Sequence, residues 1–150
     1  MYQKALELSP GDAQLAGNLA DAYRWSGNVP KADEAYGKAI ALAIKQLGVN
    51  PRDASTMDNL ALYYAKKGQY EQGAQYIAHA RALNPGAVQM IYDQAMIEAM
   101  AGKNQDALKS LREAFQRGYP AKAAEDDPEL KALQSLPEFK QLVASYASRK

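Results

Sequence analysis

Residues 60–85 read LALYYAKKGQYEQGAQYIAHARALNP, and this stretch decides the fold class. Gly68 stands near its centre with two lysines before it, and Pro85 closes it. Small and larger apolar residues on both sides of the glycine recur at helical spacing, which predicts two helices joined by a turn. The lysines fall at the end of the first helix, where cations complement the helix dipole, and Gly68 is expected to end that helix in a left-handed conformation.

The same arrangement occurs three times along the chain. Gly27, Gly68 and Gly102 are each followed by a polar residue, at intervals of 41 and 34 residues. Alanines stand seven residues before and twelve residues after each of these glycines: Ala20, Ala61 and Ala95 before, and Ala39, Ala80 and Ala114 after. Small residues at these places let two helices cross closely, so each repeat is predicted to be a helical hairpin.

Composition and motifs exclude several classes of function. The 150 residues carry a formal net charge of +1 and include no cysteine, so the chain has no overall field for polyanions, no thiol chemistry and no cysteine metal site. No apolar run approaches the ~20 residues of a membrane span. The only histidine, His79, lies between two alanines on a packing helix, and we interpret it as structural or solvent-exposed. We therefore expect no enzymatic activity, no cofactor or metal, and neither nucleic acid nor membrane as a partner.

On these residues the sequence resembles the tetratricopeptide repeat (TPR) family. The second repeat follows the family pattern at Leu60, Ala61, Tyr64, Gly68, Gly73, Ile77, Ala80 and Pro85. The third repeat departs from it at Gln94 and Glu98, where leucine and tyrosine are expected. The resemblance implies an all-α fold, a right-handed α-α superhelix of TPR helical hairpins with a C-terminal capping helical segment.

We expect a single TPR domain over residues 1–150, in five parts. These are a half repeat at 1–11, repeat 1 at 12–51, repeat 2 at 52–85, repeat 3 at 86–119 and capping helices at 120–150. The second helix of repeat 1 is expected to run from about Pro30 to Leu47, because seven added residues keep the apolar face within about 20° of its phase. The half repeat has no partner helix, so we infer that the chain begins inside a longer array, and its exposed apolar face favours self-association.

The C-terminal stretch is predicted to cap the array. Asp126-Asp127-Pro128-Glu129 and Pro137-Glu138-Phe139 each indicate the start of a helix. The stretch from Gly118 to Phe139 also resembles the terminal segment of some bacterial multidomain signalling proteins, such as serine/threonine kinases followed by TPR arrays. This resemblance implies a larger bacterial signalling protein in the cytoplasm, or in the periplasm if the parent protein is anchored in a membrane.

In TPR arrays the first helix of each repeat lines a concave groove through positions not used for packing within the hairpin. The resemblance makes the candidate peptide-binding residues Asn18, Asp21, Arg24, Trp25, Asp58, Asn59, Leu62, Lys66, Tyr92, Asp93 and Met96. Gln14, Gly17 and Ser55 belong to the same set of positions. In the family an asparagine at the places of Asn18 and Asn59 often grips the backbone of the bound peptide, since its amide both donates and accepts. The alternative interpretation of these side chains is ordinary solvated helix surface.

Two functions from different classes follow. The first is a non-catalytic protein–protein interaction scaffold that binds a peptide segment or partner domain in the groove, with Tyr63 and Lys66 as contacts at its edge. The second is a structural module that forms homo-oligomers through the unpaired N-terminal helix and binds no peptide. A clamp for the C-terminal carboxylate of heat-shock chaperones is disfavoured, because Asp21 and Asp93 replace its asparagine and arginine.

Overall fold

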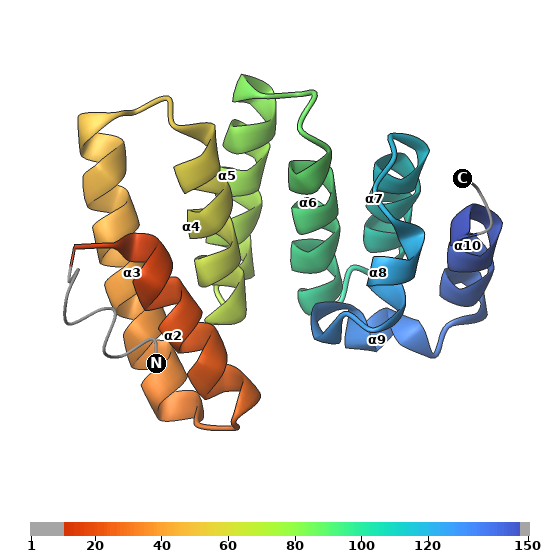
Figure 1. Cartoon of the computed structure of the whole chain (residues 1–150), viewed down its shortest axis with the longest axis horizontal. Helices are drawn as coiled ribbons and strands as arrows, with labels where there is room; N and C mark the ends of the chain where they lie inside the picture. Colours follow the sequence, from red (N-terminus) through yellow and green to blue (C-terminus); the bar gives the residue numbers. More distant parts are fainter. Residues whose placement is uncertain (1–10, 148–150) are drawn as a thin grey trace. The chain divides into compact units, whose positions relative to one another are not determined.

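A computed structural model of the chain describes residues 11–147, and this range consists of helices and the turns between them (Figure 1). Three hairpins follow one another: α2 (Ala13–Trp25) with α3 (Val29–Val49), α4 (Ala54–Lys66) with α5 (Tyr70–Leu83), and α6 (Val88–Met100) with α7 (Asn104–Gln116). The tail contains α8 (Ala121–Glu125), the 3₁₀-helix η1 (Pro128–Leu130), α9 (Lys131–Gln134) and α10 (Pro137–Ala147). The predicted all-α fold of TPR-type hairpins is confirmed. The chain divides into two compact units, with the boundary between Leu83 and Asn84.

Glycines in the left-handed conformation make the turns within the hairpins. Gly27, Gly68 and Gly102 have φ angles of 84°, 86° and 79°, a region that residues with a Cβ rarely enter. At the second turn the Gly68 N–H donates to the carbonyl of Ala65 and the Gln69 N–H to that of Tyr64, both at 2.9 Å. These bonds satisfy carbonyls that the end of α4 would otherwise leave unpaired. The predicted role of Gly68 is thus confirmed.

Aspartates begin the first helix of each hairpin in the first unit. Asp12 Oδ1 accepts a hydrogen bond from the Leu15 N–H, and Asp53 Oδ1 accepts one from the Thr56 N–H, both at 3.1 Å. Asp53 Oδ2 also accepts from the Thr56 hydroxyl at 2.8 Å. Such N-caps satisfy donors that the helix itself cannot, and they hold both carboxylates in place.

Close helix crossings form the core of the first unit. Ala16, Ala20, Ala39 and Leu60 are fully buried there. A Cβ built on Gly73 of α5 would lie 2.9 Å from the carbonyl oxygen of Ala61 in α4, too close for any side chain. The backbones of α4 and α5 can therefore approach each other only because this residue is glycine, as the repeat pattern predicts.

The longest helix in the described range is α3, with 21 residues. Its observed span, Val29–Val49, confirms the predicted long helix and extends it slightly at both ends. Figure 1 shows its last turns continuing past the N-terminal end of α2. Leu47 packs half-buried against the core, whereas Ile44 and Val49 are exposed. The extension therefore continues the packed face of α3 for part of its length.

The third repeat departs from the family pattern at Glu98 for a structural reason. The Ser110 hydroxyl of α7 donates to Glu98 Oε1 at 2.5 Å, which ties α6 to α7. Burial raises the pKa of Glu98, and the bond from Ser110 partly offsets this rise. A polar bond thus occupies the place where other repeats carry an aromatic ring.

The tail of the second unit packs back onto the last hairpin. η1 and α9 lie against α6, and α10 lies against α7 and α8. The predicted helix starts are confirmed: Asp127 caps η1 by accepting from the Glu129 N–H at 2.9 Å, and α10 begins at Pro137. Residues 1–10, which make up nearly all of the expected half repeat, lie outside the described range. A single domain with the repeat boundaries given above stays a prediction.

Candidate functional site

A hydrogen bond and an ion pair, both to Asp21, join three helices of the first unit. Asp21 of α2 accepts hydrogen bonds from the Tyr36 hydroxyl of α3 and from Lys66 Nζ of α4, the latter at 3.0 Å. Sequence reasoning placed Asp21 and Lys66 among the groove residues but not as partners of each other. Because their charges offset one another, this pair holds α2 and α4 together and offers a ligand little free charge.

Tyr63 fills the space between α2 and α4 and is only 7% exposed. Its ring lies over Gly17, where an added Cβ would come within 2.4 Å of Tyr63 Cε1. Its hydroxyl donates to the carbonyl of Ala13 at 3.4 Å. Burial, followed by the charges of Asp21 and Asp12, raises the pKa of Tyr63 to about 12. Gly17 and Tyr63 therefore pack α2 against α4, and Tyr63 also lines a hollow at the N-terminal ends of these helices.

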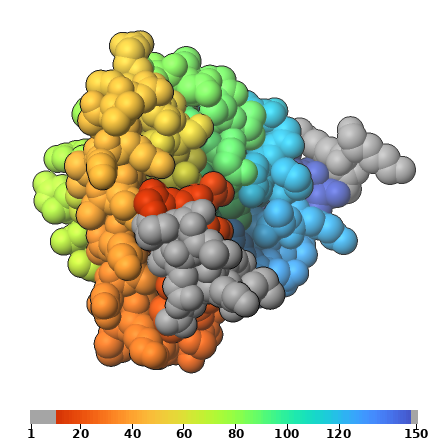
Figure 2. All heavy atoms as spheres, turned by 60° about the vertical axis from the view of Figure 1, so that its left-hand side comes forward, coloured from red at the N-terminus to blue at the C-terminus, as the bar shows by residue number. Residues whose placement is uncertain are grey.

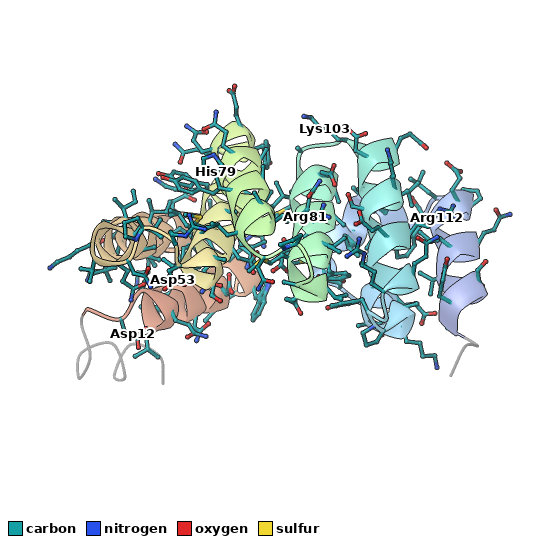
Figure 3. All side chains as sticks on the ribbon, turned by 90° about the horizontal axis from the view of Figure 1, so that it is seen from above. Asp12, Asp53, His79, Arg81, Lys103 and Arg112 are labelled. Carbon is teal, nitrogen blue, oxygen red and sulfur yellow. The ribbon has the colours of Figure 1, made fainter. Side chains whose placement is uncertain are left out.

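A concavity of about 650 Å³ opens at the N-terminal ends of α2 and α4, beside the C-terminal turns of α3. Its lining residues are Gly11, Asp12, Ala13, Gln14, Ala43, Gln46, Asp53, Ser55, Thr56, Asn59 and Tyr63. Its volume falls within the range of about 300–1,000 Å³ that is usual for ligand pockets. Figure 2 turns α2 and α3 forward, and Figure 3 labels Asp12 and Asp53 at the N-terminal ends of their helices. The candidate residue Asn59 thus lies in an observed hollow, together with Gln14 and Ser55 of the same predicted set.

Asn18 and Asn59 occupy equivalent positions on α2 and α4, nine residues before their turn glycines. Both side chains are half-buried. Neither amide makes a hydrogen bond to another residue within 11–147. Each amide can supply two donors and an acceptor to a peptide backbone. These two asparagines are thus matched candidates on neighbouring helices, each with an amide that has no hydrogen-bond partner among the described residues.

The other candidates on α2 and α4 differ in accessibility. Trp25 is 65% exposed at the end of α2. Arg24 and Leu62 are half-buried, and Asp58 is buried at 8% exposure. Trp25 is therefore the large apolar side chain on α2 that a ligand could reach without any rearrangement.

The candidates on α6 are less accessible, and the chain's own tail contacts Tyr92. Tyr92, Asp93 and Met96 are all buried. The Tyr92 hydroxyl donates to Asp127 Oδ2 at 2.6 Å, and its ring stacks on Tyr119 with centroids 3.9 Å apart. Burial and then the bond to Asp127 raise the pKa of Tyr92, so this hydroxyl stays a donor. We therefore leave these three residues out of the proposed binding surface.

His79 is exposed on α5, and no three histidine, cysteine, aspartate or glutamate side chains between Gly11 and Ala147 gather as metal ligands would. The same range has no helix with the length and apolar character needed to cross a membrane.

Two curated proteins have sequences similar to this chain. The chain is 38% identical over 116 residues to cellulose synthase operon protein C of Pseudomonas fluorescens (strain SBW25), covering 77% of this chain and 8% of that protein. It is 30% identical over 102 residues to the photosystem I assembly protein Ycf3 of Acaryochloris marina (strain MBIC 11017), covering 63% of this chain and 60% of that protein. The chain therefore spans less than two thirds of either relative.

The crystal structure of MamA protein aligns with a TM-score of 0.49 and 17% identity, over 77% of this chain and 78% of that one. The family model for the tetratricopeptide repeat matches residues 11–85, the whole of the first two hairpins. This chain belongs to the tetratricopeptide repeat family.

Proposed function

We propose that the protein is a non-catalytic interaction scaffold that binds an extended peptide segment of a partner protein along α2 and α4. The observation that carries the proposal is the pair of equivalent asparagines, Asn18 and Asn59, whose half-buried amides have no hydrogen-bond partner among the described residues. Burying a polar group without a partner is unfavourable, so a ligand backbone that pairs with both amides would be stabilised. Trp25 offers an apolar contact at the opposite end of α2 from the concavity.

The surroundings of the two asparagines suit a binding surface that does not rearrange. The Asp21–Lys66 ion pair and the packed ring of Tyr63 hold α2 and α4 at a set distance. A surface held in this way loses little conformational freedom when a ligand binds. Members of the family bind protein segments on this kind of helix face, and one relative is named for assembling a larger complex.

The test uses an array of random decapeptides probed with the full chain, followed by fluorescence anisotropy on the strongest binders. Asn18→Ala and Asn59→Ala should each weaken binding by about 1–3 kcal/mol, since each amide makes up to two hydrogen bonds. That loss corresponds to roughly a five- to hundredfold rise in Kd. Asn84→Ala is the matched control, because Asn84 is exposed and lies outside α2 and α4. Unchanged affinity in both groove variants would refute the assignment.

We also propose that this array belongs to a larger bacterial signalling protein. The support is the resemblance of residues 118–139 to the terminal segment of such proteins, together with the packing of that segment onto the last hairpin. Self-assembly without a peptide ligand remains the second candidate. Exposed apolar side chains on the first hairpin, such as Val29 and Val49, favour it. Light scattering over a concentration series tests it, because a constant mass would exclude self-association.

A further inference from the structure

In the concavity beside α2 and α4, the charged side chains among the described lining residues are all negative. Among the described residues that line it, the charged ones are Asp12 and Asp53. The remaining polar groups are neutral, and this includes the Tyr63 hydroxyl, whose pKa of about 12 keeps it protonated at physiological pH. We call this concavity the acidic pocket.

The positive charges supplied by the described residues offset the two carboxylates of the acidic pocket only in part. The N-termini of α2 and α4 each contribute roughly half a positive charge, against two carboxylates, so roughly one negative charge remains. Lys66 is engaged by Asp21 and does not line the pocket. Lys45 and Arg52 are neighbours in sequence of lining residues, but both are exposed and lie outside the lining. A positively charged group would therefore be attracted into this space.

Both carboxylates are already oriented to accept further hydrogen bonds. Asp12 uses one oxygen to cap α2, and its second oxygen makes no hydrogen bond within the described range. Asp53 caps α4 with both oxygens, each of which has two lone pairs. The caps hold these groups in place without exhausting their acceptor capacity. Asn59 lines the same pocket, so a residue held there by its backbone could place its side chain beside the two aspartates.

We propose that the acidic pocket takes a lysine or arginine side chain of the bound peptide. The inference rests on the proposed function, because Asn59 would hold the backbone of the same peptide. Charge complementarity supports this occupant: the concavity measures about 650 Å³, and its lining residues between Gly11 and Tyr63 other than the two aspartates are neutral. A basic side chain would form charge-assisted hydrogen bonds to carboxylates that are held in a fixed geometry.

The test pairs a double variant of the protein with a matched change in the ligand. Asp12→Asn/Asp53→Asn removes both charges and keeps the caps, because asparagine caps a helix as well as aspartate does. Asp33→Asn on α3 makes the same kind of charge change at an exposed position outside the pocket. The probes are the decapeptides selected above, each with its basic residues replaced singly by glutamine. All are N-acetylated, so that a terminal amine cannot supply the positive charge. Circular dichroism verifies that each variant is folded.

The outcomes separate this inference from the proposed function. We expect glutamine at one peptide position to weaken binding about tenfold or more for the unaltered protein and for Asp33→Asn. The same replacement should change the Kd by less than about twofold for the double variant, because its pocket no longer contains the two carboxylates. Binding that depends on Asn18 and Asn59 but is indifferent to glutamine overturns the inference alone. Peptides that bind independently of both asparagines overturn the proposed function, and the inference with it.

Discussion

Gly17→Ala tests the packing that holds the two binding helices together. The new Cβ would lie 2.4 Å from Tyr63 Cε1 and 2.6 Å from the Cζ and hydroxyl oxygen of the same ring. Carbon atoms in contact normally stay about 3.5–4.0 Å apart, so the overlap exceeds about 1 Å. Tyr63 cannot retreat easily, because its ring is also packed against Tyr36 with centroids 6.3 Å apart. The substitution must therefore displace the ring or separate α2 from α4.

The expected loss of stability follows from two opposing effects. Overpacking a core costs typically 1–3 kcal/mol, and the size of this overlap places the cost near 3 kcal/mol. Alanine gains about 1 kcal/mol over glycine in helix propensity. The net change is a destabilisation of about 2 kcal/mol, or a fall of roughly 8–15 °C in Tm for a unit of this size.

Gly37→Ala provides the matched control for this prediction. Gly37 is also a helical glycine of the first unit, but the nearest atom to its added Cβ is Lys67 Nζ at 3.8 Å. The free energy of unfolding of this variant should rise by up to about 1 kcal/mol, from helix propensity alone. Urea unfolding, monitored by circular dichroism at the helix band, measures the stability of Gly17→Ala and Gly37→Ala. If Gly17→Ala were as stable as Gly37→Ala, the reasoning from the Tyr63 contact would be refuted. In the double variant with Tyr63→Ala the penalty of Gly17→Ala should disappear, because the obstructing ring is gone.

Three further predictions follow from the same contacts. Tyr92→Phe removes the bond to Asp127 and should speed hydrogen exchange across η1 and α9, whereas Asp126→Asn, at an exposed neighbouring position, should not. Because the folded-state pKa of Tyr63, about 12, exceeds its unfolded value of about 10, stability should fall as pH rises from about 10 to 12. Tyr63→Phe should lack that part of the fall, as urea midpoints at the two ends of this range would show. Trp25→Ala should leave the urea midpoint unchanged, because its side chain is 65% exposed, yet weaken binding of the selected peptides.

Local patterns were enough to predict most of the secondary structure. The turn at Gly68 and the start of η1 at Asp127 depend on residues a few positions apart. The length of α3 follows from the apolar periodicity and the late stop at Gly48 and Pro51. Such signals act within one or two helical turns, so a single sequence contains them in full.

The accessibility of the candidate residues depended on contacts that no local pattern contains. Lys66 meets Asp21 across 45 residues, and Tyr92 meets Asp127 across 35. Periodicity placed Asp21, Lys66 and Tyr92 on the groove side of their helices, yet the first two neutralise each other and the third lies under the tail. Which side chains meet depends on how far each helix is rotated and offset against its neighbours. The rotation and offset of each helix are set only when the hairpins pack. In the packed structure the amides of Asn18 and Asn59 have no hydrogen-bond partner among the described residues.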